Sequence, residues 1–129
     1  MEKSTLLDAS ENGDISTVKE HIENGADVNT MDEYNRPILL KAAKHGHLEI
    51  VQYLIDQGAD VNLRDNRGTS ALYWAAVKGH TPIVELLLNQ GAEPHVTDDR
   101  GWSALDHAQM GKLTEIAEML KRTPTAGTV

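Results

Sequence analysis

The chain contains no cysteine and no phenylalanine, and tyrosine and tryptophan together supply only five of its 129 residues. The absence of cysteine excludes a disulfide framework and a thiolate metal site. With so few aromatic side chains, a core must be built from leucine, isoleucine, valine and alanine. Apolar residues make up 40% of the chain and charged residues 25%, which is ordinary for a globular protein of one domain.

Basic residues are also scarce. Twelve lysines and arginines face twenty acidic residues, and the net charge is −8. This balance disfavours a nucleic-acid partner or an anionic membrane surface. No apolar run approaches the roughly 20 residues that a membrane-spanning helix needs, and the chain starts without an apolar signal stretch. We therefore expect no nucleic acid, no membrane and a cytoplasmic location, with the nucleus as an alternative.

The sequence repeats itself every 33 residues, and several residue types keep this spacing independently. Chance is a poor explanation for such agreement, and an interval of this length indicates a stacked-repeat architecture. The series are Gly13, Gly46 and Gly79; Gly25, Gly58 and Gly91; Leu6, Leu39, Leu72 and Leu105; and Asp32, Asp65 and Asp98.

Each unit carries two short helical patterns followed by a polar turn, and the third unit shows this most clearly. Ser70 is a good N-cap for a helix over 71–78, and Gly79 can end that helix with a positive φ. The second helix starts at about Pro82, whose fixed φ suits a first turn, and ends before Gly91.

The first two units depart from this pattern at their starts. In the first unit, Ser4 is the expected cap of a helix over 6–12, and a second helix follows over 15–23. In the second unit, Pro37 stands in the capping position. Proline removes the side-chain cap, so we expect a less regular turn there.

The fourth unit has the features of a terminal repeat. Ser103 with Asp106 is close to a capping box, and Gly111 comes one residue early relative to Gly79. Its second helix, at about 114–122, is more polar, as an outermost repeat requires. The expected units are 1–31, 32–64, 65–97 and 98–122, and we expect a disordered tail over 123–129.

The pattern resembles the ankyrin repeat over about residues 4–122. The resemblance is carried by Asp65-Asn-Arg-Gly68, Ala75-Ala76, Gly79-His80, Ile83-Val84 and Leu86-Leu87-Leu88, and by the Gly-Ala-Asp-Val-Asn ends at 25–29 and 58–62. It implies an all-α solenoid of helix-turn-helix pairs with projecting hairpin-like loops. It also implies non-catalytic binding of another protein through a concave face of loops and first helices.

The ankyrin turn Thr-Pro-Leu-His is kept in no unit. Its histidine is replaced by Leu7, Leu40, Tyr73 and Asp106, so the histidine–threonine hydrogen bond expected for the family is missing. We expect looser turns as a result. Asn35 replaces the turn glycine of the second unit, and asparagine tolerates positive φ better than most residues.

The resemblance also points to the exposed, variable positions where partner specificity is expected. Five bases and two acids, Glu33 and Asp99, lie among these positions, so the face is net positive on an acidic protein. Because the face is net positive, we expect a partner with an acidic patch. Aromatic and arginine residues are frequent interface hot spots, so we expect Tyr34, Trp74 and Trp102 to anchor it. The predicted partner-binding residues are Tyr34, Arg36, Lys44, His45, Arg67, Thr69, Val77, Lys78, Arg100, Trp102 and Met110, with Trp74 at an adjoining half-exposed position that Lys41 and His107 share.

A purely structural interpretation of these residues stays open. Trp74 can be a packing residue of its helix, Trp102 can cover the neighbouring loop, and any single base can belong to a solvated face. The clustering of the bases is stronger evidence than any one of them.

No enzyme motif is present: the sequence has no glycine-rich phosphate loop, no nucleophile elbow and no His-Glu-x-x-His. His47 and His80 occupy the structural histidine position of the repeat. His45 and His47 lack a third metal ligand, and His21, His95 and His107 show no partnered pattern. We expect no catalytic residue, no cofactor and no metal.

Two further hypotheses concern Asn62 and self-association. Asn62 lies in a context that resembles the target of an asparagine-hydroxylating dioxygenase, although the same asparagine has a structural role in the repeat. The first unit is strongly acidic and the last is polar, so both ends suit solvent and we expect a monomer.

Overall fold

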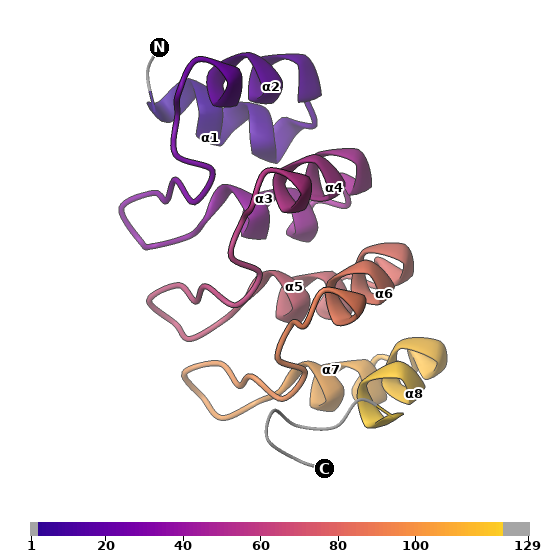
Figure 1. Cartoon of the computed structure of the whole chain (residues 1–129). Coiled ribbons are helices and arrows are strands. Elements are labelled where there is room, and N and C mark those ends of the chain that lie inside the picture. Colours follow the sequence, from indigo (N-terminus) through magenta and orange to yellow (C-terminus); the bar gives the residue numbers. More distant parts are fainter. Residues whose placement is uncertain (1–2, 123–129) are drawn as a thin grey trace.

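The computed structural model describes residues 3–122, which form eight helices and no extended strand (Figure 1). The helices pair as four antiparallel hairpins that stack along one axis. The predicted tail over 123–129 lies outside the described residues. The helices are α1 (Lys3–Asn12), α2 (Ile15–Glu23), α3 (Ile38–Lys44), α4 (Leu48–Asp56), α5 (Ala71–Val77), α6 (Thr81–Asn89), α7 (Ala104–Met110) and α8 (Thr114–Arg122).

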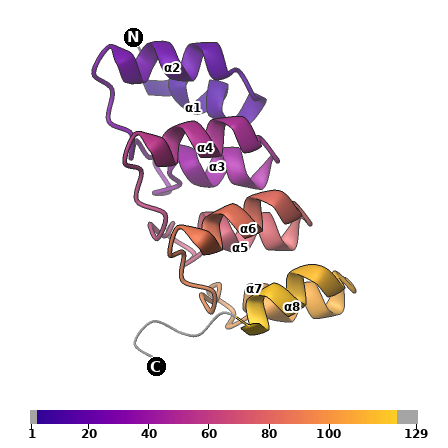
Figure 2. The ribbon, with the colours of Figure 1, turned by 45° about the vertical axis from the view of Figure 1, so that its right-hand side comes forward.

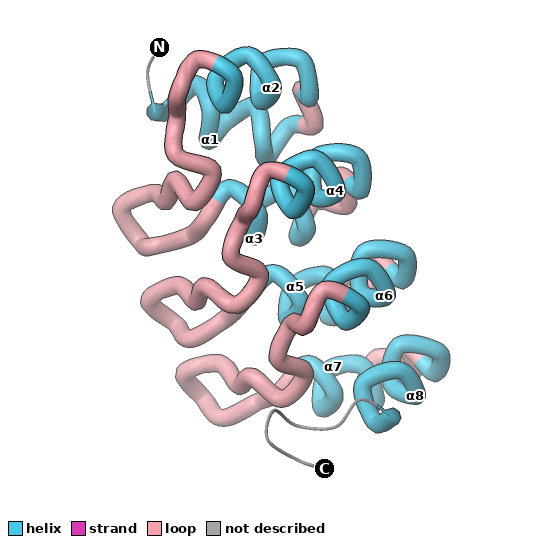
Figure 3. Tube along the Cα trace, in the orientation of Figure 1, coloured by secondary structure: helices cyan, strands magenta, loops and turns pink. Residues whose placement is uncertain are grey.

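The stack has two helical layers and a series of loops on one side. The first helices of the pairs form one layer, the second helices form the other, and the long loops project together (Figures 2 and 3). The first helices contact one another more extensively than the second helices do, because buried alanines such as Ala42 and Ala75 allow close approach. The side formed by the loops and first helices is therefore the concave one. The predicted all-α solenoid is confirmed.

The core is a ladder of side chains that recur once in every repeat. In the second-helix layer, Val18, Val51 and Val84 are completely buried, and so are Leu54, Leu87 and Leu120. Burying a leucine or valine contributes roughly 1.5–3 kcal/mol, so each rung stabilises the contact between successive pairs. This nearest-neighbour arrangement is what holds a solenoid together.

His21 occupies the place that leucine holds in the other three pairs, and it is buried. Its Nδ1 lies 2.9 Å from the carbonyl oxygen of Thr17, to which it donates. Its Nε2 is buried without a hydrogen-bond partner, and the residue lines a cavity of about 640 Å³ between α1 and the first loop. His21 is therefore a core residue with one hydrogen bond, where the sequence indicated no partner.

Three of the four helix starts with a predicted capping pattern agree with it. The Ser70 hydroxyl accepts from the Tyr73 amide, and Ser103 with Asp106 forms a complete capping box. Pro37 is an N-cap without a side-chain bond, as expected. The cap expected at Ser4 is wrong, because α1 already begins at Lys3.

The turn between α7 and α8 differs from the others because its glycine is displaced. Gly46 and Gly79 take positive φ values at the corresponding turns. In the fourth pair Gly111 is the helix C-cap with φ −81°, and Lys112 takes the left-handed conformation with φ 59°. A residue with a side chain is strained there, at a cost of roughly 1–2 kcal/mol.

Lys112→Gly should therefore stabilise the protein. We expect a gain of about 0.5–1 kcal/mol in the free energy of unfolding, because relief of the strain exceeds the added freedom of the unfolded chain. Chemical denaturation measures it. Lys121→Gly, inside α8, is the matched control and should destabilise by about 1 kcal/mol. A loss of stability in Lys112→Gly would contradict the strain.

Candidate functional site

The three long loops are closed in the same way by one aspartate each. Oδ1 of Asp32 accepts from the amides of Tyr34 and Arg36, both at 2.9 Å. Oδ1 of Asp65 and of Asp98 accepts from the amides two and four residues further on, at 2.9–3.0 Å. The loop that precedes Pro37 thus has the same hydrogen-bond scheme as the loops that precede Ser70 and Ser103. The expectation of a less regular turn at Pro37 is wrong, and the loops are closed without the missing histidine.

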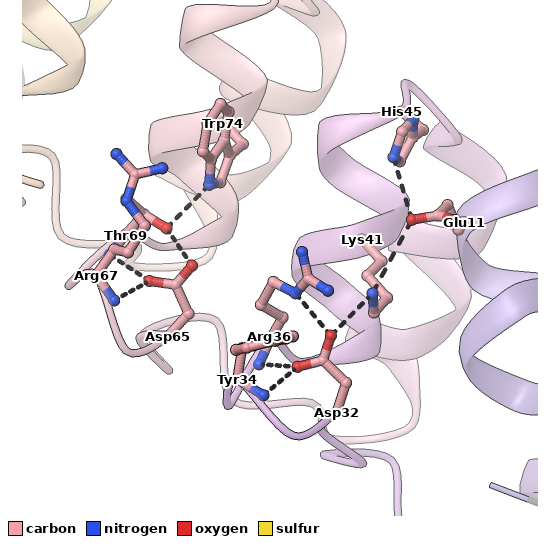
Figure 4. A network of polar contacts seen from close by, with 10 residues as sticks. All are labelled: Glu11, Asp32, Tyr34, Arg36, Lys41, His45, Asp65, Arg67, Thr69 and Trp74. Carbon is pink, nitrogen blue, oxygen red and sulfur yellow. Dashed lines mark hydrogen bonds and ion pairs between the residues drawn. The ribbon is translucent and has the colours of Figure 1, made fainter. Parts of the chain in front are cut away.

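The second oxygen of each aspartate has a different partner in each loop. Oδ2 of Asp32 accepts from Arg36 Nε at 2.6 Å and pairs with Lys41 Nζ at 3.1 Å (Figure 4). Burial alone would raise the pKa of Asp32, but hydrogen bonds from Arg36 and Lys41 outweigh it and hold the pKa well below its usual range. Lys41 is buried, not half-exposed as the sequence indicated, and it also lies 4.0 Å from Glu11.

In the second loop, a relay of hydrogen bonds fixes a tryptophan. Thr69 Oγ1 donates to Oδ2 of Asp65 at 2.7 Å and accepts from Trp74 Nε1 at 2.9 Å (Figure 4). Thr69 is completely buried, so its predicted place among the partner-contacting residues is wrong. Its role is to orient the indole of Trp74, which stays half-buried at the surface.

In the third loop, Asp98 is buried and bound by two side chains. The hydroxyl of Tyr73 donates to Oδ2 at 2.7 Å, and His107 Nε2 lies 2.9 Å from the Tyr73 oxygen and 3.6 Å from Oδ2. The Tyr73 hydrogen bond, against the effect of burial, holds the pKa of Asp98 well below its usual range. His107 thus has partners that the sequence did not indicate, and Tyr73 links two repeats from the position of the missing histidine.

Other polar side chains join successive repeats away from the loop tips. Nε2 of His47 donates to the Glu11 carbonyl at 2.8 Å, and Nε2 of His80 donates to the Lys44 carbonyl at 3.0 Å. The structural role expected for these two histidines is confirmed by this geometry.

Asn62 is exposed, yet both ends of its amide are bound. Its Oδ1 accepts from the Glu93 amide at 2.7 Å, and its Nδ2 donates to the Gly91 carbonyl at 3.2 Å. Asn29 accepts from the Asp60 amide in the same way, one repeat earlier. The structural reading of Asn62 accounts for these contacts, and its hydroxylation stays a prediction.

Most predicted partner-binding residues are at the surface. Tyr34, Trp102 and Met110 expose 54%, 39% and 70% of their surface. His45, Arg67, Lys78 and Arg100 are exposed, whereas Arg36, Lys44, Trp74 and Val77 are partly buried.

Several of the predicted cations already have acidic partners. Arg36 pairs with Asp32 and lies over the Tyr34 ring, with its guanidinium carbon 5.1 Å from the ring centroid. Arg67 Nε lies 3.5 Å from Asp99.

His45 Nε2 lies 3.6 Å from the Glu11 carboxylate. Burial, only partly offset by Glu11, lowers the pKa of His45, so its ring stays largely neutral at pH 7. Sequence reasoning missed Glu11, although its place one repeat before Lys44 is a signal that it lies on the same face.

Residues 3–122 contain no group of three or more histidine, aspartate or glutamate side chains that could hold a metal ion. None of the eight helices is long and apolar enough to cross a membrane.

Stacked helix pairs with loops along one edge define a helical repeat protein. A family model described as ankyrin repeats, in three copies, matches residues 6–98, and the chain belongs to the ankyrin-repeat family. Comparison with curated proteins found no matching relative. The fourth pair, α7 and α8, lies beyond the matched residues, but it packs on the third pair and its loop has the same aspartate geometry.

The Tyr73–Asp98 bond should make stability depend on pH. The folded pKa of Asp98 is depressed, so its contribution is present above the unfolded pKa of about 3.9 and is lost as pH falls below it. Tyr73→Phe should destabilise the protein at pH 7, and the difference from wild type should shrink as pH falls from about 4 towards the depressed folded pKa of Asp98. Chemical denaturation at several pH values measures this difference.

Tyr53→Phe, on the second-helix layer, is the control and should show no such pH dependence in the acid range. A gap between wild type and Tyr73→Phe that stays constant from pH 7 down to about pH 2 would contradict the assignment.

Proposed function

We propose that this chain binds another protein, without catalysis, through the concave surface of its loops and first helices. Ankyrin repeats are generally protein–protein interaction modules, and the family is typically non-catalytic. We call this surface the loop face, defined by the exposed side chains of the segments 31–37, 64–70 and 97–103, of the first helices and of the residue that follows each first helix.

Exposed apolar side chains carry the proposal. Four large apolar residues in the described chain are exposed, and three of them, Tyr34, Trp102 and Met110, belong to the loop face. Leu48, the fourth, lies on the second-helix layer. Exposed aromatic residues on a rigid support are typical interface anchors.

The basic residues support a partner with an acidic patch. Lys78 and Arg100 are exposed on the loop face, and Lys44 is partly exposed and shares the Trp74 ring with Lys78. Arg36 and Arg67 are bound to Asp32 and Asp99, so an acidic partner would have to compete with these internal pairs. The other bases should therefore contribute more to partner choice than these two arginines.

The proposed contact surface keeps every predicted residue except the buried Thr69. A surface of this extent is near the small end of specific interfaces, so a few anchors must supply most of the affinity. The proposed contacts are Tyr34, Arg36, Lys44, His45, Arg67, Trp74, Val77, Lys78, Arg100, Trp102 and Met110.

A comparison of the two layers tests the proposal. Proteins are captured from the source cells with wild type, with Tyr34→Ala plus Trp102→Ala, and with Leu48→Ala as the control. Affinity for the purified captured protein is then measured. We expect the double variant to bind at least tenfold more weakly, because each anchor is worth about 1–2 kcal/mol, and Leu48→Ala to bind within about twofold of wild type.

The opposite pattern would contradict the proposal. If Leu48→Ala abolishes binding while the double variant retains it, the second-helix layer is the interface. Circular dichroism of each variant shows whether the fold is intact.

A further inference from the structure

Residues 33 positions apart occupy equivalent places in successive repeats. The contact between one helix pair and the next, here called a step, can therefore be compared along the stack. At the first step, from the first pair to the second, the Glu11 carboxylate faces a lysine and a histidine of the next repeat. It lies 4.0 Å from Lys41 Nζ and 3.6 Å from His45 Nε2 (Figure 4). Here the protein supplies its own carboxylate to the lysine ammonium and the histidine ring.

At the second step the same positions carry different side chains. Lys44 stands where Glu11 stood, Trp74 where Lys41 stood, and Lys78 where His45 stood. Lys44 Nζ lies 4.3 Å from the centroid of the Trp74 ring, and Lys78 Nζ lies 6.0 Å from the same centroid. Two ammonium groups therefore meet at one indole ring, where a cation is attracted to the aromatic face.

No carboxylate of residues 3–122 forms an ion pair with either lysine. The acidic side chains that form ion pairs on this face are bound to Arg36, Lys41, His45 or Arg67, or to His107 further along. Partial burial, and then the charges of Lys78 and Arg36, lower the pKa of Lys44, and the charge of Glu11 offsets only part of this effect. The second step thus concentrates positive charge that the first step neutralises.

The tryptophan between the lysines is rigidly held. Trp74 Nε1 is bound to Thr69, which is bound in turn to Asp65, and the ring packs edge-on against Tyr73 with centroids 5.2 Å apart. The third step has no comparable basic pair, because Val77 and Gly111 take the places of Lys44 and Lys78. Within the described repeats, this arrangement occurs at the second step.

We infer that Lys44, Trp74 and Lys78 form a subsite for a glutamate or aspartate side chain of an acidic partner peptide. The incoming carboxylate would supply the negative charge that Glu11 supplies one repeat earlier, and the indole would pack against the methylene groups of the same side chain. The inference rests on the proposed function and locates its acidic contact at one repeat step.

An NMR titration with a defined probe tests the subsite. The probe is the peptide acetyl-Glu-Glu-Glu-amide at low salt, with acetyl-Gln-Gln-Gln-amide as the uncharged control. In wild type, the glutamate peptide should shift the Trp74 indole resonance and the amides of Lys44 and Lys78, and the glutamine peptide should not. Addition of salt should weaken the binding, since the contact is an exposed ion pair.

Paired variants locate the charge requirement. Lys44→Gln with Lys78→Gln should weaken peptide binding by roughly tenfold or more, since an exposed ion pair is worth up to about fivefold. Lys121→Gln with Arg122→Gln, at the end of α8, removes the same charge elsewhere and should change the affinity by less than twofold.

Lys44→Glu gives a sharper result, because it places a carboxylate at the position that Glu11 holds in the first step. This single variant should abolish peptide binding while leaving the protein at least as stable as wild type, since it replaces the Lys44–Lys78 repulsion with an attraction. Retained binding by Lys44→Glu, or equal weakening by the α8 control, would overturn the subsite.

The residues whose NMR resonances shift on peptide addition distinguish failure of the subsite from failure of the proposed function. If the glutamate peptide shifts Arg100 and Trp102 but not Trp74, the loop face still binds acidic peptides and the subsite is wrong. If the shifts fall on the second-helix layer around Leu48, both the subsite and the acidic-partner proposal are wrong.

Discussion

The loops of this protein depend on one repeated interaction: a carboxylate oxygen that accepts two backbone amides. Asp32, Asp65 and Asp98 each bind the amides two and four residues ahead through Oδ1. These bonds close the loop and aim it away from the helices. Because the aspartates recur at the period of the helical core, every loop leaves the stack at the same place, and together they form one surface.

The second oxygen of each aspartate gives each loop its own chemistry. It binds Arg36 and Lys41 in the first loop, orients Trp74 through Thr69 in the second, and receives Tyr73 in the third. One group therefore serves the common backbone and also positions the side chains that differ. In this way the loops acquire individual surfaces without any change in the backbone hydrogen bonds that close them.

The fold could be predicted from the sequence because many residues indicate it at once. Glycines, leucines and alanines that recur at one common interval indicate helix pairs that stack, and each series supports the others. Local exceptions were harder to predict. The strain at Lys112 arises from a one-residue displacement of Gly111, and the displacement is visible in the sequence although its backbone consequence is not.

The candidate site was predicted less completely, because position in a repeat does not fix a side chain's partners. Thr69 fits the variable surface by its place in the unit, yet a hydrogen bond to Asp65 holds it inside. His107 and Tyr73 meet Asp98 only after two repeats have stacked, and Glu11 reaches Lys41 and His45 across the first interface. Contacts between repeats require the geometry of the stack, which a linear pattern does not contain.

The central claim is that each loop aspartate has two separable roles, and variants at Asp65 test it most directly. Asp65→Asn keeps an oxygen for the backbone amides and alters only the group facing Thr69, whereas Asp65→Ala removes both contacts. Measured by chemical denaturation, Asp65→Asn should cost about 1 kcal/mol and Asp65→Ala roughly 2–4 kcal/mol, because the alanine leaves two amides unsatisfied. Equal losses in the two variants would contradict the separation of roles.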